Sequence, residues 1–252
     1  MYNLENITLD ANNIIRDKST SDGSQIKYNY NNKWYKIDKF GGEAESETLV
    51  SLLLECSNMP EEKYVRYSKI NINGQLGCVS NDFRLDKNNE EFITFYRLYK
   101  NLYGHDLASI TSRMDYDDAI MYVIDFVKDT LDLDTTAYLA NIFYLDEIIL
   151  NTDRHFNNYG IIMANDSYRE APIFDNGKSL LTGQKCIETD TIDKIIKEVY
   201  SKSFSPNFKL NSDYLKKYRT LEFEKDKILE KLEHHPDSLQ KNVLLYQINK
   251  LL

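Results

Sequence analysis

Short runs that alternate apolar and polar residues dominate the first part of the chain. Two pairs of these runs are separated by Asn31-Asn32 and by Asn73-Gly74, residue types that favour tight turns. A β-hairpin is therefore predicted at each place, with arms at residues 26–30, 33–37, 63–72 and 75–79. Between the hairpins, residues 43–56 place leucines on one face at helical spacing and predict an amphipathic helix.

Helical periodicity replaces this alternation from residue 90 onward. The pattern predicts helices at residues 91–103, 115–131, 134–150, 190–201, 220–232 and 236–252. The helix at 134–150 is apolar around most of its circumference, so it is predicted to be the central buried helix of this region. Asp134 and Thr135-Thr136 provide a favourable N-cap, and the helix leads into a polar stretch at 151–158.

These elements predict an α+β protein with two lobes. Residues 1–82 would form a small β-rich lobe with one helix, and residues 83–252 would form a mostly helical lobe. The segment from Val79 to Asp82 is the predicted crossing between them, because the β pattern ends there.

Composition narrows the classes of function. The chain has 252 residues, of which 42% are apolar and 28% charged, and its net charge is -9 with a pI of 5.1. This balance argues against a protein that binds nucleic acid by bulk electrostatic attraction. No apolar run reaches the length of a membrane span, and residues 1–10 lack a signal-peptide pattern. We therefore expect a cytoplasmic protein, with secretion by a route that uses no signal peptide left open.

The strongest chemical signal lies between residues 150 and 181. Asp153 is followed five residues later by Asn158, and a second aspartate, Asp175, follows an apolar run. Mg²⁺ is usually held by one or two carboxylate or amide oxygens together with nucleotide phosphates. A hydroxyl nucleophile also needs a nearby carboxylate that orients it and accepts its proton. Asp153 is thus the predicted catalytic base of a phosphotransfer site, and Asn158 and Asp175 are its predicted metal ligands.

A lysine in the first lobe is the candidate for holding phosphates. Lys36 lies on a predicted strand and Glu47 on the helix that follows, an arrangement in which a helix glutamate orients a kinase lysine. Glu43 and Glu45 are competing carboxylates, and Lys39 is the alternative lysine.

Other parts of the predicted site come from loops. The polar loop at 19–25 is small and rich in hydroxyl groups, so it is a candidate cover for phosphates. A nucleotide base is expected to lie against the crossing segment, at Val79. In the polar stretch, Arg154 either assists with a phosphate or neutralises Asp153 and Asp175, and His155 is expected to order the loop.

Two segments of this chain resemble the catalytic and metal-binding motifs of the HipA-like serine/threonine kinases. They are N-T-D-R-H-F-N-N at 151–158 and I-F-D-N-G at 173–177. The match is closest to the compact CtkA-like branch of the family. It implies a two-lobed fold distantly related to protein and phosphoinositide kinases, with ATP and Mg²⁺ as cofactors. It also implies that Lys36 contacts the α- and β-phosphates, and that the phosphate loop includes Gly23, Ser24 and Lys27.

The resemblance further implies a mode of regulation. In HipA-like toxins, a serine in or beside the phosphate loop is autophosphorylated, which ejects the loop and switches the enzyme off. The candidates in this chain are Ser19, Thr20, Ser21 and Ser24. By comparison with long HipA proteins, this chain is expected to lack the extra N-terminal subdomain that helps bind the antitoxin. Whether this protein pairs with an antitoxin is therefore left open. A separate small antitoxin-like partner would take the place of that subdomain.

The expected activity is ATP- and Mg²⁺-dependent phosphorylation of serine or threonine in a protein substrate, with toxin-like autophosphorylation. One alternative is a nucleotide-binding pseudokinase or regulatory module, although intact Asp153 and Asp175 argue against it. Another is a lipid or small-molecule kinase, because Asp-Arg-His-x-x-Asn also occurs in phosphoinositide kinases. The acidic charge and the lack of an obvious basic amphipathic helix argue against a membrane substrate. No direct nucleic acid or membrane contact is expected.

Overall fold

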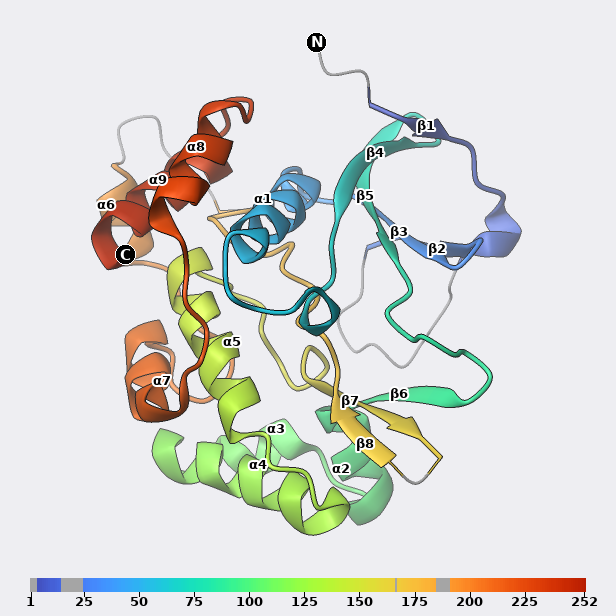
Figure 1. Cartoon of the computed structure of the whole chain (residues 1–252). Coiled ribbons are helices and arrows are strands. Elements are labelled where there is room, and N and C mark those ends of the chain that lie inside the picture. Colours follow the sequence, from blue (N-terminus) through green and yellow to red (C-terminus); the bar gives the residue numbers. More distant parts are fainter. Residues whose placement is uncertain (1–3, 15–24, 166, 185–190) are drawn as a thin grey trace.

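The computed structural model of the chain describes residues 4–14, 25–165, 167–184 and 191–252 (Figure 1). Within these residues, a curled five-stranded sheet lies at one end, and helices with a three-stranded sheet form the rest. The first sheet has the strand order β1-β4-β5-β3-β2, and only the pair β1 and β4 is parallel. Its strands are β1 (Asn6–Ile7), β2 (Lys27–Tyr30), β3 (Lys33–Ile37), β4 (Ser68–Ile72) and β5 (Gln75–Asn81), and a 3-10 turn at Ala11–Asn13 precedes β2.

Both predicted hairpins are present in the first sheet. Asn31 and Asn32 have φ angles of 49° and 61°, and Asn73 and Gly74 have φ angles of 52° and 80°. Turns of this left-handed kind match the twist of antiparallel strands, and Asn and Gly enter them at low cost. The arm predicted at 63–72 begins later, as β4, because Glu61–Lys63 forms a short 3-10 turn.

Helix α1 (Glu43–Glu55) links the first sheet to the rest of the molecule, and its prediction is confirmed. On the sheet side, Ala44 packs with Tyr67 and Cys78. On the other side, Leu49 and Leu53 belong to the main apolar core, which they share with the later helices. The apolar core is therefore continuous across residue 82, where the sequence predicted the border between the two lobes. The division into lobes at 1–82 and 83–252 stays a prediction.

The second sheet corrects one predicted helix. It consists of the antiparallel strands β6 (Glu90–Thr94), β7 (Gly160–Ala164) and β8 (Ser167–Glu170). The predicted helix at 91–103 starts only at α2 (Phe95–Tyr103), after Thr94 caps it. Phe92 and Ile93 suit a strand as well as a helix, and the pairing with β7 decides between the two.

Helix α5 (Thr136–Ile149) is the buried centre of the helical part, as predicted. Its residues Leu139, Ile142, Leu145 and Ile148 are completely buried. The helix ends at Leu150, whose left-handed φ of 54° turns the chain into the polar stretch. The helices around it are α3 (Leu107–Thr111), α4 (Tyr116–Leu131), α6 (Ile192–Ile196), α7 (Phe208–Tyr214), α8 (Lys225–Glu233) and α9 (Leu239–Leu251), with a 3-10 turn at Lys216–Tyr218.

The remaining predicted helices are present, but several of them differ from the prediction in where they begin or end. The predicted helix at 115–131 is confirmed as α4. Helix α6 is shorter than predicted, and α8 and α9 begin later. No prediction covers α3 or α7, because helices of 5 and 7 residues show too little periodicity to detect.

The fold class is α+β, as predicted, with a sheet-rich part that carries α1 and a larger part that is mostly helical. The change from one sheet to the other takes place over residues 82–89. None of the helices in the described residues combines the length and the apolar character that crossing a membrane requires.

Gly77 on β5 lies where the sheet leaves no room for a side chain. A Cβ there would collide with the backbone carbonyl of Lys36 and with the side chain of Ile72. We expect Gly77→Ala to lower the free energy of unfolding by about 1–3 kcal/mol, because β3 and β5 must move apart. Urea denaturation measures the change. Leu76→Ala, at an exposed neighbouring position, is the control, with an expected change below about 0.5 kcal/mol. Wild-type stability of Gly77→Ala would contradict this account.

Candidate active site

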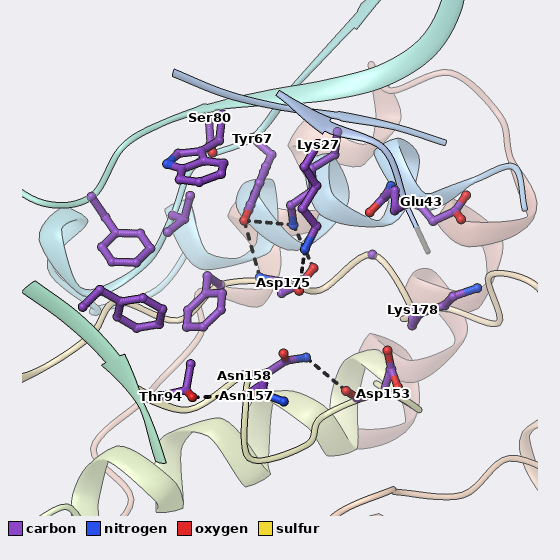
Figure 2. A pocket seen from close by; sticks show the side chains of 18 of the residues that line it. Lys27, Glu43, Tyr67, Ser80, Thr94, Asp153, Asn157, Asn158, Asp175 and Lys178 are labelled. Carbon is purple, nitrogen blue, oxygen red and sulfur yellow. Dashed lines mark hydrogen bonds and ion pairs between the residues drawn. The ribbon is translucent and has the colours of Figure 1, made fainter. Parts of the chain in front are cut away.

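A pocket of about 500 Å³ lies between the first sheet and the loops that follow α5 and β8 (Figure 2). We call it the central pocket. Its walls come from β2, β3, the segment after β5, the start of α1, the loop at 153–158 and the loop at 174–178. Stretches that are far apart in the sequence therefore converge on one space.

Lys36 lies at the charged end of the central pocket. Its Nζ is 2.8 Å from Glu47 Oε1 and 2.8 Å from Asp175 Oδ1, and it donates to the Tyr67 hydroxyl at 3.4 Å. Burial opposes the positive charge, but Asp175 and Glu47 outweigh it and hold the pKa of Lys36 well above its usual value. Lys36 is therefore a permanent cation in the pocket.

Glu47 is the carboxylate on α1 that pairs with Lys36. Its second oxygen accepts a hydrogen bond from Asn176 N at 2.9 Å, which ties α1 to the loop beside Asp175. The competing carboxylates are engaged elsewhere. Glu43 accepts hydrogen bonds from the backbone N–H groups just before α1, and Glu45 accepts one from the residue that caps α9.

Asp175 faces Lys36 from the loop after β8. Its φ of 59° is left-handed, a conformation that Asp adopts more readily than most residues. Its Oδ2 lies 3.9 Å from Lys27 Nζ, and the two side chains point toward each other in Figure 2. Burial raises the pKa of the carboxyl, but Lys36 and Lys27 more than offset this and hold it well below its usual value. The carboxylate therefore stays ionised.

The loop after α5 holds Asp153 at the mouth of the central pocket. Asp153 N donates to Asn151 Oδ1 at 3.0 Å, and Asn158 Nδ2 donates to the Asp153 carbonyl at 3.0 Å. Thr152 N donates to the Lys178 carbonyl at 3.1 Å, which joins this loop to the one that carries Asp175. The backbone around Asp153 is thus fixed, while its side chain is 37% exposed.

Arg154 lies beneath the loop and is 1% exposed, so it contacts neither phosphates nor Asp153. Its Nε and Nη2 donate to Asp146 of α5 at 3.0 and 2.9 Å. Its Nη1 donates to the Phe174 carbonyl at 2.8 Å, and its Nη2 donates to Asn176 Oδ1 at 2.6 Å. The phosphate contact considered for Arg154 is therefore wrong, and the geometry is that of a support for both loops.

Other predicted site residues are only partly brought together. His155 lines the central pocket, and burial lowers the pKa of its ring, so it is neutral near pH 7. Val79 does not line the pocket: it packs against the cluster on the opposite face of the sheet, because successive strand residues face opposite sides. Ser80 lines the pocket in its place. Outside the described residues lie Ser19, Thr20, Ser21, Gly23 and Ser24.

The sequence analysis did not identify the apolar end of the central pocket. Phe83, Phe92 and Phe174 meet there, with ring centroids 5.1 to 5.8 Å apart, and Val65 and Trp34 line the space beside them. These residues come from different elements, so no spacing in the sequence marks them. The one available signal is the position of Phe174 within the motif at 173–177.

No family model and no curated protein matches the sequence. Among solved structures, the proinflammatory kinase CtkA of Helicobacter pylori is similar with a TM-score of 0.64 and 16% identity, over 98% of this chain and 93% of that chain. HipA of Shewanella oneidensis MR-1, solved with HipB and its operator DNA, is similar with a TM-score of 0.54 and 12% identity, over 96% of this chain and 66% of the HipA chain. The chain has the HipA/CtkA-like kinase fold.

The HipA/CtkA-like fold places Asp175 and Asn158 on opposite walls of the central pocket (Figure 2). One carboxylate and one amide oxygen are a donor set that Mg²⁺ accepts when phosphates complete its coordination shell. Within the described ranges, no group of three or more His, Cys, Asp or Glu side chains is arranged to hold a metal by itself. The donor set therefore fits a magnesium ion that enters together with a nucleotide.

The bonds of Arg154 predict a large effect on stability. Arg154→Met would leave Asp146 buried without its counter-charge, so we expect the free energy of unfolding to fall by about 3–5 kcal/mol. Chemical denaturation measures this loss. The double variant Arg154→Met/Asp146→Leu removes both charges and is expected to recover part of it. A single variant as stable as the double variant would show that the buried charge is not the cause.

Proposed function

We propose that this protein is an ATP- and Mg²⁺-dependent protein kinase that phosphorylates serine or threonine. The observation that carries the proposal is the convergence of two groups of side chains on one pocket. Lys36, held by Glu47, faces Asp175 on one wall, and Asp153 and Asn158 lie on the other. The fold that the chain shares with CtkA, whose structure is described as that of a kinase, supports the same activity.

The central pocket offers matching surroundings for both halves of a nucleotide. The three phenylalanines at its apolar end suit a planar base, since aromatic rings pack well against one another. Lys36 and Lys27 at the charged end suit the phosphates. We therefore assign the base to the residues after β5 and the phosphates to the space beside Asp175.

Asp153 is the residue we assign to the acceptor hydroxyl. Its carboxylate orients the hydroxyl and accepts its proton while the hydroxyl oxygen bonds to the γ-phosphorus. The bond from that phosphorus to the bridging oxygen of ADP breaks, and ADP leaves with the bond's electron pair. Asn158 and Asp175 would hold Mg²⁺, which supplies positive charge to the phosphate oxygens.

The exposure of Asp153 supports a protein substrate. Its side chain is 37% exposed at the pocket mouth, so a side-chain hydroxyl on another protein or on a loop of this chain would be able to reach it. Autophosphorylation in the segment before β2 and a small antitoxin-like partner remain parts of this proposal. HipA of Shewanella oneidensis was solved with HipB, which supports a search for such a partner.

Loss of the proposed base should abolish phosphoryl transfer. We expect Asp153→Asn to lower transfer from γ-labelled ATP to protein by about 10²–10⁴-fold, because an amide cannot accept the proton. Labelling of the chain itself and of a generic protein substrate measures it. The control is Asp213→Asn, which changes an exposed carboxylate on α7 and should leave transfer unchanged. An unlabelled wild type that nevertheless binds ATP would favour the regulatory module.

Nucleotide binding has a separate test in thermal unfolding. At about 100 times its Kd, ATP with Mg²⁺ should stabilise the protein by about 2.7 kcal/mol, which corresponds to a rise in Tm of about 5–10 °C for a chain of this size. Asp175→Asn should shrink this rise because it removes a proposed ligand of Mg²⁺, and EDTA should shrink it because it removes the ion whose positive charge binds the phosphates. Asp153→Asn should keep it. The absence of any shift in the wild type would contradict the proposal.

A further inference from the structure

Lys202 makes an ion pair with the proposed catalytic base. Its Nζ lies 2.8 Å from Asp153 Oδ1, although the two residues are 49 positions apart in the sequence. The side chains are 42% and 37% exposed, so the pair lies in solvent at the pocket mouth. Exposed pairs contribute at most about 1 kcal/mol to stability and rearrange easily. Stability therefore does not explain why a lysine is held at this point.

The loop that carries Lys202 packs against the loop at 153–158. The hydroxyl of Ser203 is buried and donates to the Arg154 carbonyl, next to Asp153. Asn211 of α7 closes the loop from the other side: its Oδ1 accepts from Ser205 N at 3.0 Å, and its Nδ2 donates to the Ser205 carbonyl at 2.9 Å. These bonds fix the backbone after Lys202, and Ser201 N, which donates to the Pro206 carbonyl at 2.9 Å, fixes the residue before it.

The residue after Ser203 adds a second constraint. Phe204 has a left-handed φ of 60°, which costs an aromatic residue about 1–2 kcal/mol. Its ring packs against Phe143, Phe156 and Tyr159, with centroid distances of 5.4, 5.4 and 6.5 Å. Packing of this extent compensates for the unfavourable backbone. The loop is thus held at its base, while the Lys202 side chain is 42% exposed.

The chemistry of the proposed transfer calls for a cation at this position. During transfer, negative charge spreads over the oxygens of the phosphoryl group as it moves from ADP to the acceptor. Lys36 and Lys27 lie on the nucleotide side, at Asp175. The Lys178 ammonium, on the pocket wall, lies 3.4 Å from the centre of the Phe40 ring. Lys202 supplies positive charge at Asp153, where the acceptor hydroxyl arrives.

We propose that Lys202 is a catalytic residue that binds the phosphoryl group in transit. This inference rests on the proposed kinase function. In the empty site the ammonium group neutralises Asp153, and when substrates are bound it donates hydrogen bonds to the moving phosphoryl oxygens. The acceptor proton passes to Asp153, the bond to ADP breaks as described above, and Lys202 keeps its own proton throughout.

Steady-state kinetics test this role. We expect Lys202→Met to lower kcat by about 10²–10³-fold, as for the loss of one transition-state hydrogen-bond donor, with the KM for ATP unchanged. Lys202→Arg keeps the charge and should restore much of the rate. Lys209→Met, which removes an exposed lysine on α7, is the control and should behave as wild type. An unchanged kcat in Lys202→Met, or a change confined to KM, would overturn the proposal.

A labelling experiment tests the position of Lys202 without turnover. An acyl-phosphate derivative of ATP transfers its acyl group from the γ-phosphate to a nearby lysine amine, and peptide mass spectrometry of the wild type locates the amide. Acylation of Lys202 together with Lys36 supports the proposal, with Lys209 expected to stay unmodified. Acylation of Lys36 without Lys202 would overturn this inference alone. No acylation of either lysine would overturn the proposed kinase function and this inference with it.

Discussion

Lys36 forms the interaction on which the arrangement of the site depends. Its ammonium group is bonded at 2.8 Å to Glu47 on α1 and at 2.8 Å to Asp175 in the loop after β8. A charged group buried without its partner costs several kcal/mol, so each of the three holds the others in place. The first sheet, α1 and the loop that carries Asp175 are thereby joined at one point, which is also the wall of the central pocket.

Arg154 joins the other side of the site in a comparable way. It links the loop at 153–158 to Asp146 of α5 and to Asn176, whose backbone N–H is bonded to Glu47. Asn176 therefore connects the Lys36 interaction with the Arg154 interaction. Phosphoryl transfer depends on the positions of charged groups more than on covalent chemistry by the protein. The bonds that stabilise the fold are for this reason also the bonds that would position the reactants.

The distribution of charge differs between the whole molecule and the site. The chain has a net charge of -9, whereas Lys27, Lys36 and Lys178 line the central pocket and Lys202 lies at its mouth. A local concentration of cations attracts an anionic ligand even on an acidic protein, because low-dielectric walls focus the field in a cleft. The overall charge argues against bulk binding of nucleic acid, and the local charge suits an anionic ligand such as a nucleotide.

Features that depend on neighbouring residues were predictable from the sequence. The hairpin turns at Asn31-Asn32 and Asn73-Gly74, the buried character of α5 and the motif around Asp153 each lie within one short segment, so local conformation and spacing reveal them. The tertiary structure decided which distant groups meet. Glu43 and Glu45 competed in the sequence with Glu47, the expected partner of Lys36, and the docking of α1 against the loop at 174–178 decides for Glu47. The burial of Arg154, the outward face of Val79 and the contact of Lys202 with Asp153 likewise follow from packing between segments, which no local pattern records.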